Sequence, residues 1–313
     1  MSTTTLVTGA AGFAGGHLVD ALIADHVDVV GWCRPGGAPP RDVPGVRWRG
    51  VDILDAAAVR RAIEETRPAV IYHCAGAAHV GQSWTTVTQT MRVNVMGTHH
   101  VVEALRAVAP DTKLLITSSA HIYGSSLDPI NESYTIAPDS PYALSKLAQE
   151  MVGFGNAGRP PVYIARPFNH FGPRQDPSFV SAAFARQIAQ IETGLIPAQI
   201  RVGNLEALRD LTDVRDTVRA YRLIVERGVP ERPYNICSGV ALAVHTLLDM
   251  LLAEATVKVE VVTDPARYRP NDSPMLLGDP SRAKQELGWE AAVPTEQTVR
   301  DLLEYWRARV RGA

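Results

Sequence analysis

Three glycines follow the first apolar segment of the chain and constrain its fold more than any other feature. They are Gly9, Gly12 and Gly15 in the sequence TLVTGAAGFAGGHLVDAL, where a strand pattern leads into a helical pattern. Only backbone without a Cβ can turn this tightly and let a dinucleotide pyrophosphate approach a helix N-terminus. The spacing is G-x-x-G-x-x-G and not the commoner G-x-G-x-x-G. Its position at the start of a β–α–β unit nevertheless favours a cofactor site over a purely structural turn.

The first half of the chain alternates strand and helix patterns. Apolar runs typical of strands stand at residues 4–8, 27–32, 46–51, 69–74, 113–119 and 162–166. Helical periodicity covers Gly15–Asp25, Asp55–Thr66, Met91–Val108 and Pro141–Phe154. This alternation predicts an α/β fold of the Rossmann type, a doubly wound parallel sheet with helices on both faces and right-handed crossovers.

The pattern changes after residue 166. The next segment, RPFNHFGPRQDP, reads as a loop, and another loop, DPARYRPNDSP, precedes the last helix. Between and after them we expect helices at Ser178–Glu192, Asp213–Arg227, His245–Glu254 and Thr295–Arg311, with strands near Ile200 and at residues 233–237 and 257–262. At 313 residues, the chain is long enough for two domains. We predict a dinucleotide-binding domain over residues 1–166. We predict that residues 167–313 form mainly a smaller α/β substrate domain, and that the helix at 213–228 and the following strand return to the first domain.

Composition and charge narrow the classes of function. The chain has 31 Lys and Arg against 33 Asp and Glu, so it lacks the basic excess of a nucleic-acid-binding protein. Its three cysteines are isolated, and its histidines show no metal-binding spacing. We therefore predict neither a disulfide framework nor a metal site. We find no signal-peptide pattern and no run of 18 apolar residues, and expect a cytoplasmic protein without a membrane segment.

The end of the second strand bears on which cofactor binds. An NAD site needs a carboxylate there to accept from the adenosine ribose hydroxyls, but VVGWCRPGG places Arg34 at this point. A cation favours a 2′-phosphate, so we predict NADP, with NAD as the alternative. The competing interpretation is that Arg34 is a solvated loop cation. Asp52, after the third strand, either bonds the adenine amino group or caps the helix that starts near Asp55.

A tyrosine and a lysine stand four residues apart in SPYALSKLAQE. Tyr142 and Lys146 therefore share one face of a helix, and the upstream segment LLITSSAHIYG ends a strand at Ser118 and Ser119. The carboxyl ends of such strands are where ligands bind. These residue types suit redox chemistry between a carbonyl and an alcohol, in which Ser steadies the oxygen and Tyr transfers its proton. We expect the lysine cation to lower the phenol pKa from about 10. The alternative is a buried Tyr with a Lys that extends to solvent.

At these motifs the chain resembles a known family, the extended short-chain dehydrogenase/reductases that modify nucleotide sugars. The resemblance covers nearly the whole chain, and its first half rests on TGAAGFAGGHL, HCAGAAHVGQSW, VNVMGT, ITSSAHIYG and PYALSKLAQE. Its second half is similar to the branch of GDP-mannose 4,6-dehydratase and GDP-4-keto-6-deoxy-mannose reductase, in ARPFNHFGPRQ, VGNLEALRDLTDVRD, YNICSG and RYRPNDSPMLLGDPSRAKQELGW.

The resemblance implies a set of site residues. The catalytic group would be Ser119, Tyr142 and Lys146, with Tyr123 as the marker of the serine motif. The predicted cofactor contacts include the glycine loop; they are Gly9, Gly12, Phe13, Ala14, Gly15, Arg34, Asp52, Ile53, Ala75, Asn94, Tyr142 and Lys146. The predicted substrate contacts are Ser83, His121, Asn169, Arg174, Arg209, Arg269 and Asp272. Of these, Arg209 and Arg269 would neutralise the diphosphate of the substrate, which suits bidentate cations.

One position departs from the dehydratase pattern. Dehydratases of this branch carry Glu two residues before Tyr123, where it removes the proton at C5 of the sugar, and this chain has His121 there. An imidazole can act as a base in principle. The alternative interpretation is that His121 is only a polar residue that lines the cleft. We predict a reductase that uses NAD(P)H to reduce the C4 keto group of a GDP-4-keto-6-deoxy-hexose. It would convert GDP-4-keto-6-deoxy-D-mannose to GDP-D-rhamnose.

Two alternatives remain open from the sequence. One is a nucleotide-sugar 4-epimerase or 4,6-dehydratase with tightly bound NAD(P). The other is a non-catalytic cofactor-sensing protein on the same fold, although such proteins commonly lack the Tyr or the Lys.

The resemblance also implies a homodimer held by a four-helix interface of Met91–Val108 and Pro141–Phe154. The apolar positions there would suit packing on the sheet equally well. They are Val101, Val102, Leu105, Leu144, Leu147 and Met151.

Overall fold

The computed structural model describes residues 4–36, 43–154, 159–267 and 274–312. Its central feature is a seven-stranded sheet in which every neighbouring pair is parallel. The strand order is β10 (Pro233–Ile236), β6 (Val162–Pro167), β5 (Lys113–Thr117), β4 (Val70–His73), β1 (Thr5–Thr8), β2 (Val29–Cys33) and β3 (Val46–Gly50). The order reverses at β1, as in a doubly wound sheet, so the predicted fold class is confirmed.

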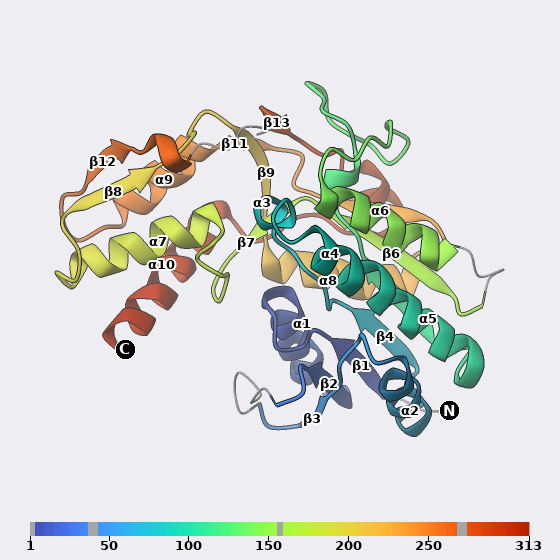
Figure 1. Cartoon of the computed structure of the whole chain (residues 1–313). Helices are drawn as coiled ribbons and strands as arrows, with labels where there is room; N and C mark the ends of the chain where they lie inside the picture. The colour runs from blue at the N-terminus through green and yellow to red at the C-terminus, as the bar shows by residue number, and fades with distance from the viewer. Residues whose placement is uncertain (1–3, 37–42, 155–158, 268–273, 313) are drawn as a thin grey trace.

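Helices cover both faces of this sheet (Figure 1). On one face, α1 (Phe13–Ala24) and α8 (Val214–Arg227) pack on a core that includes Val7 and Leu115. On the other, α2 (Ala56–Thr66), α5 (Gly97–Val108) and α6 (Pro141–Phe154) pack toward Leu114 and Ile116. The alternate residues of β5 thus point into two separate cores, which is why the strand reads as a continuous apolar run.

The helix predicted over Met91–Val108 contains an irregular turn. The chain passes from α3 (Val80–Ser83) to α4 (Val87–Met91), through a π-helical turn at Arg92–Met96, and directly into α5. Such turns are rare and are frequently found at functional sites. This one carries Asn94, a predicted cofactor contact.

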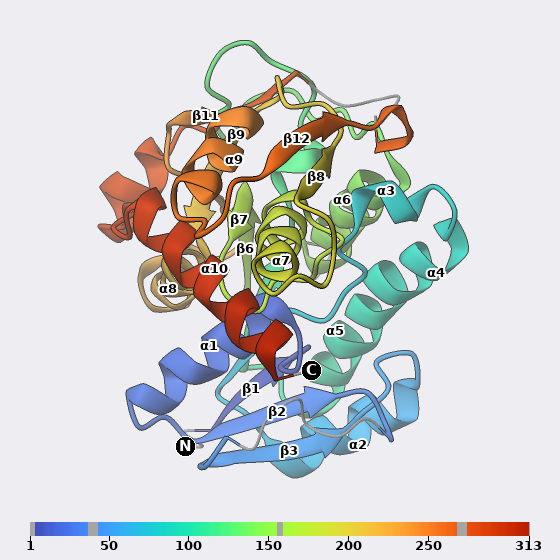
Figure 2. The same cartoon turned by 90° about the vertical axis from the view of Figure 1, so that its left-hand side faces the viewer.

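The second half of the chain adds a smaller region beside the large sheet (Figures 1 and 2). Its helices α7 (Val180–Glu192), α9 (Val244–Ala253) and α10 (Thr295–Arg311) share one hydrophobic core with the strand β8 (Gln199–Val202). β8 pairs with β12 (Glu260–Thr263) in parallel. Within the described residues, no helix is both long and apolar enough to cross a membrane.

One strand connects the smaller region to the segment that follows β6. It is β9 (Leu208–Asp213), which pairs with β7 (Asn169–Phe171), β11 (Ala241–Ala243) and β13 (Met275–Leu276). The prediction of a loop after β6 was therefore wrong at residues 169–171. This strand forms only because β9, some forty residues away in sequence, supplies its hydrogen-bonding partner.

Candidate active site

The glycine loop lies at the carboxyl ends of β1 and β4. Gly9 has a left-handed backbone (φ +64°), and a Cβ added there would lie 2.7 Å from the Ala75 amide nitrogen. A Cβ on Gly15 would collide with the Gly9 carbonyl. Gly12 is the N-cap of α1 but provides no side-chain cap, and the first turn of α1 carries no acidic residue. The residues present therefore fit a dinucleotide, because they leave a cradle without side chains at a helix N-terminus suited to an anion.

Four other predicted cofactor residues lie on α1 and after the strands β2 and β3. Phe13 and Ala14 form the first turn of α1, and the Phe13 ring stacks on His170 with centroids 5.7 Å apart. Arg34 is exposed after β2 and makes no hydrogen bond or ion pair with the residues that the structure describes. The Ile53 side chain packs against Gly97 at the start of α5.

Asp52 does not cap the helix that follows it, so that interpretation is wrong. Asp55 is the N-cap of α2, and its side chain accepts from the Ala58 amide at 2.9 Å. The Asp52 carboxylate accepts from the Leu54 amide at 2.9 Å, inside the loop after β3. Adenine recognition by Asp52 stays a prediction.

Ser119, Tyr142 and Lys146 come together at the carboxyl end of β5. The Ser119 hydroxyl accepts from the His121 amide at 3.2 Å and forms a hydrogen bond with the Tyr142 side chain. Lys146 donates from Nζ to the Thr117 carbonyl at 2.8 Å, and Nζ lies 5.8 Å from the centroid of the Tyr142 ring. Only 8% of Tyr142 and 5% of Lys146 are exposed. The three side chains thus form one shielded cluster.

The charge states in this cluster differ from the sequence expectation. Burial raises the pKa of Tyr142, and the hydrogen bond from Ser119 only partly opposes this. The expected net lowering of the phenol pKa was therefore wrong in this structure, since desolvation by burial sets the direction of the shift at Tyr142. Burial also lowers the pKa of Lys146 to about 8, against smaller opposing effects from Cys74 and Glu150. At neutral pH Tyr142 is protonated and Lys146 is mostly cationic.

Asn94 and Ser83 bond to the protein around this cluster. The Asn94 amide accepts from Ala77 N at 2.7 Å and donates to Ala77 O at 3.1 Å and to Ser145 Oγ at 2.8 Å. Ser83 Oγ donates to Val80 O at 2.6 Å and accepts from the Tyr142 amide at 3.2 Å. Asn94 therefore fixes the loop after β4 against α6, and Ser83 fixes the start of α6.

Three of the predicted substrate residues, His121, Asn169 and Arg209, fall in two places. The His121 ring lies edge-on to Tyr142, with ring centroids 6.0 Å apart. Asn169 lies half-buried on β7 beside Leu211 of β9, and Arg209 lies two residues earlier on β9. One guanidinium nitrogen of Arg209 donates to the Leu208 carbonyl at 2.8 Å.

Another predicted substrate contact, Arg174, lies elsewhere. Arg174 forms an ion pair with Asp20 of α1 at 2.8 Å, so it links the loop after β7 to the first helix. Arg269 and Asp272 lie outside the described residues.

Sequence reasoning missed a buried network behind the cluster. Arg166 binds Glu150 through two hydrogen bonds, of 2.9 and 2.6 Å, and donates to the Tyr123 hydroxyl at 2.7 Å. That hydroxyl donates to Asn235 Oδ1 of β10 at 2.8 Å. The network joins α6, one turn beyond Lys146, to the turn that follows Ser119. Two signals in the sequence could have indicated this network. They are the charge of Arg166 at the end of the apolar strand 162–166 and the carboxylate of Glu150 on an otherwise apolar helix.

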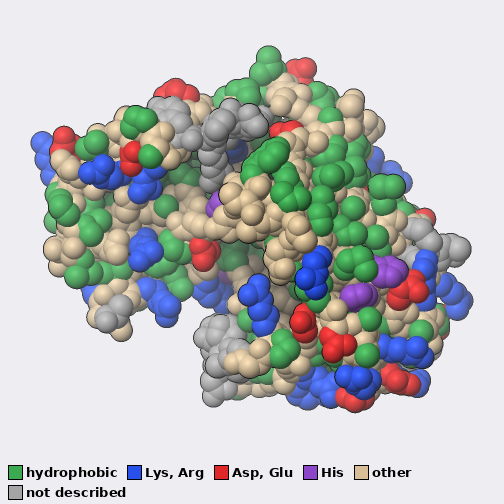
Figure 3. Space-filling view, in the orientation of Figure 1, with side chains coloured by type: hydrophobic (Ala, Val, Ile, Leu, Met, Phe, Trp, Pro, Cys, Tyr) green, Lys and Arg blue, Asp and Glu red, His purple; other side chains and the backbone are tan. Residues whose placement is uncertain are grey.

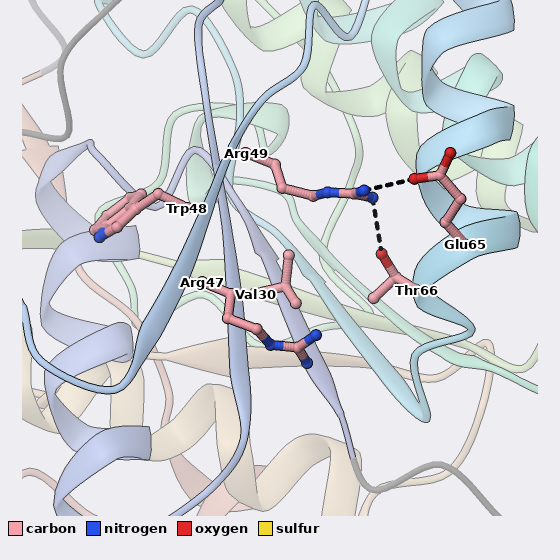
Figure 4. Close-up of a pocket in the computed structure, with 6 residues that line it drawn as sticks. All are labelled: Val30, Arg47, Trp48, Arg49, Glu65 and Thr66. Carbon is pink, nitrogen blue, oxygen red and sulfur yellow. Dashed lines mark hydrogen bonds and ion pairs between the residues drawn. The ribbon is translucent and has the colours of Figure 1, made fainter.

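A surface pocket lies at the edge of the sheet (Figure 4). It lies between β3 and α2, and Arg49 at its rim pairs with Glu65 and donates to Thr66 at 3.5 Å. Three strands, β2, β1 and β4, separate β3 from β5. Among the described residues, no group of three or more His, Cys, Asp or Glu is placed to hold a metal ion.

Comparisons with known proteins agree on one group of enzymes. The model of the family described as GDP-mannose 4,6 dehydratase matches residues 6–302. A GDP-6-deoxy-D-mannose reductase of Pseudomonas aeruginosa is 35% identical over 99% of both chains. A GDP-mannose 4,6-dehydratase of Vibrio cholerae serotype O1 is 27% identical over 95% of this chain and 92% of its own.

Solved structures give the same result. The structure of RMD from Pseudomonas aeruginosa complexed with NADPH superimposes with a TM-score of 0.86 at 31% identity, over 98% of this chain and 100% of the other. A UDP-glucose 4-epimerase from Thermotoga maritima, with UDP-glucose, superimposes with a TM-score of 0.88 at 27% identity, over 98% of this chain and 99% of the other.

Proposed function

The chain belongs to the GDP-mannose 4,6-dehydratase family of NAD(P)-dependent nucleotide-sugar enzymes, and from this premise we propose that it is a reductase. Its substrate is a GDP-4-keto-6-deoxy-hexose, and the conversion is that of GDP-4-keto-6-deoxy-D-mannose to GDP-D-rhamnose. The observation that carries the proposal is a protonated Tyr142 beside Ser119 and Lys146, with His121 where the dehydratase pattern has Glu. The similarity to a GDP-6-deoxy-D-mannose reductase supports it.

NADPH is the proposed reductant, and it supplies the hydride for the C4 carbonyl carbon when bound. Gly9, Gly12 and Gly15 would hold its pyrophosphate at the start of α1, because no side chain blocks the approach there. Arg34, exposed and unpaired among the described residues, would take the 2′-phosphate. The structure of a similar protein in complex with NADPH supports this choice, and NAD is the alternative.

Tyr142 provides the proton that the reduction needs. Reduction turns the carbonyl oxygen into an alkoxide, which must gain one proton to become the product hydroxyl. Tyr142 keeps its proton at neutral pH because burial raises its pKa, so it is ready to act as the acid. Ser119 would donate its single hydroxyl hydrogen to the carbonyl oxygen of the substrate, which holds that oxygen beside the Tyr142 phenol. The Lys146 cation stabilises the phenolate that remains until water returns the proton.

His121 separates this function from dehydration. The family's dehydratases need a carboxylate at this position to remove the C5 proton, and a reductase needs no group for that step. The imidazole lies edge-on to the Tyr142 ring, at the rim of the cluster. The alternative function is a 4-epimerase or 4,6-dehydratase that keeps its NAD(P) bound.

Residues of β7 and β9 would bind the diphosphate of the substrate. Asn169 and Arg209 lie on these paired strands, near the end of β6 and half-exposed. A guanidinium group there would neutralise phosphate charge through paired hydrogen bonds. Arg269 and Asp272 are proposed contacts from the sequence alone, as are the roles of His121, Ser83 and Arg174 in substrate binding.

We also propose a cytoplasmic homodimer. An apolar surface lies over α4, the π-helical turn and α6 (Figure 3), where Val87, Met96, Leu144 and Met151 are each more than 40% exposed. Three of the expected interface residues do not belong to this surface: Val101, Val102 and Leu105 are buried in the core under the sheet. The apolar surface that remains would be covered by the same helices of a second copy.

The function is tested by the stoichiometry of the reaction. The purified chain is incubated with GDP-4-keto-6-deoxy-D-mannose and a known amount of NADPH, and the loss of absorbance from the reduced nicotinamide is followed. We expect one NADPH consumed for each sugar reduced, with the Tyr142→Phe variant silent. No net consumption by the wild-type chain contradicts the proposal, and turnover of GDP-mannose or UDP-glucose by bound cofactor would then indicate a dehydratase or an epimerase.

A further inference from the structure

A buried polar chain runs beneath the proposed cofactor site and has no part in the chemistry described above. It consists of Thr8 at the end of β1, His73 at the end of β4, Thr98 on α5 and Gln149 on α6, all of them fully buried. Thr8 Oγ1 lies 2.8 Å from His73 Nδ1, and His73 Nε2 lies 3.1 Å from Thr98 Oγ1. Gln149 donates from Nε2 to Thr98 Oγ1 at 2.6 Å. Buried polar groups are paired in stable proteins, so each bond has a direction that can be worked out.

The directions follow from the Thr98 hydroxyl, which has a single hydrogen. It donates that hydrogen to the Asn94 carbonyl at 2.7 Å. Thr98 Oγ1 must therefore accept from His73, and the proton of the imidazole lies on Nε2. Nδ1 is then an acceptor for the Thr8 hydroxyl. Thr8 Oγ1 in turn accepts from the Ala75 amide at 3.1 Å. Only the Nε2–H tautomer of His73 satisfies both hydrogen bonds of the ring, to Thr8 and to Thr98.

His73 thereby joins three parts of the site. Through Thr8 it holds the Ala75 amide, the group against which Gly9 packs so closely that a Cβ would not fit. Its own carbonyl accepts from the Thr117 hydroxyl at 3.0 Å, and the Thr117 carbonyl accepts from Lys146. Through Thr98 it reaches the π-helical turn of Asn94. The loop after β4 and the π-helical turn are thus tied to the imidazole, and α6 is tied to the His73 backbone through Thr117.

We propose that His73 is a positioning residue for NADPH, and that its fixed Nε2–H tautomer sets the geometry of the loop at residues 75–77 that the dinucleotide requires. The proposal rests on the proposed function only in naming NADPH as the ligand. Burial, assisted by the nearby Lys146 charge, lowers the pKa of His73 to about 3, so the imidazole stays neutral at physiological pH. A charged imidazole would have two donors and could not accept from Thr8.

The tautomer is tested directly by NMR without any ligand. Long-range proton–nitrogen spectra of the 15N-labelled full chain are recorded, with the His73 signals assigned by their loss in His73→Gln. We expect a protonated Nε2 and a bare Nδ1, with no change between about pH 5 and 8. A proton on Nδ1, or a titration within this range, overturns the proposal. If His73→Gln does not fold, Thr8→Val makes the assignment, because only Nδ1 loses its partner.

The effect on binding is tested with a matched control. Thr8→Val removes the hydroxyl from this chain, Thr8→Ser restores it, and Thr112→Val removes a buried hydroxyl that donates to the Pro68 carbonyl at the opposite end of β5. We expect Thr8→Val to raise the Kd for NADPH about tenfold, by fluorescence titration, because it leaves the half-buried Ala75 amide without its partner. Thr8→Ser and Thr112→Val should keep the wild-type Kd, although Thr112→Val should lower the melting temperature as much as Thr8→Val does.

Each remaining outcome is informative. Equal NADPH affinities for Thr8→Val and Thr112→Val overturn the positioning role. If the wild-type chain binds no NADPH, that result contradicts the proposed function but not the proposal for His73. The tautomer measurement then decides the proposal for His73, and the same titration is repeated with NADH.

Discussion

The two sides of the proposed site are built in different ways. On the cofactor side, the ends of β1, β4 and β5 are neighbours in one buried sheet, and their polar groups are linked in closed hydrogen-bond chains. On the substrate side, β7 and β9 are short strands that are far apart in sequence, and Asn169 and Arg209 are only half-buried. The comparison suggests that the first side fixes geometry for the chemistry, whereas the second side supplies binding contacts.

The largest contrast should come from single substitutions on the two sides. We expect Tyr142→Phe to lower kcat by about a thousandfold, because it removes the proton donor and little else. Asn169→Ala should instead raise KM for the sugar nucleotide with kcat nearly unchanged. Steady-state kinetics with both substrates varied make the measurement. An equal fall of kcat in both variants would show that the substrate side also takes part in the chemistry.

A second contrast concerns two ion pairs, one in each region. Arg166 and Glu150 are 6% and 1% exposed in the sheet region, and Arg307 and Glu192 are 12% and 6% exposed in the smaller region. Arg166→Met should lower the free energy of unfolding by about 3–5 kcal/mol, since it leaves a buried carboxylate without its partner. Arg307→Met should cost about 1.5 kcal/mol, because Glu192 still accepts from the Thr256 amide and is closer to solvent. Urea unfolding followed by circular dichroism checks both values, and equal losses would remove the contrast.

Two glycines with similar backbone angles sharpen the comparison further. Gly9 and Gly194 have φ values of +64° and +72°, but a Cβ on Gly9 would meet Ala75 whereas one on Gly194 meets nothing within 4 Å. Gly194→Ala should therefore cost only the backbone strain of about 1–2 kcal/mol, without effect on NADPH affinity. Gly9→Ala should in addition weaken NADPH binding at least tenfold, measured by titration. Normal affinity in Gly9→Ala would mean that the loop does not hold the cofactor.

The smallest expected effect is a pH dependence confined to the cofactor side. Lys146 has a pKa lowered to about 8, so it is charged below that pH and loses its proton above it. If the cation is needed, kcat/KM falls as pH rises past about 8, and Lys146→Arg, which keeps its charge, moves this fall to higher pH. If kcat/KM stays constant up to roughly pH 9.5, the Lys146 cation is not needed for the proton transfer.

The same difference explains what could be predicted from the sequence. The parallel sheet and the glycine loop were predictable, because each strand is a local apolar run and each glycine has a local backbone reason. The pairing of Tyr142 with Lys146 was equally local, as one helix face. The irregular turn at Asn94 and the strand β7 were missed, since they depend on partners distant in sequence. The direction of the pKa shift at Tyr142 also depends on distant parts of the chain, because burial sets it and the spacing of residues does not reveal burial.

The central claim is that the chain transfers hydride to C4 of the sugar and does not take it back. The most direct test uses NADPH that carries deuterium at the transferable position, with GDP-4-keto-6-deoxy-D-mannose as substrate. We predict a GDP-deoxyhexose product that is heavier by about one mass unit, with the deuterium at C4 and one NADP⁺ formed per sugar. A product without deuterium, or turnover without net oxidation of NADPH, would contradict the account and indicate an enzyme that returns the hydride it borrows.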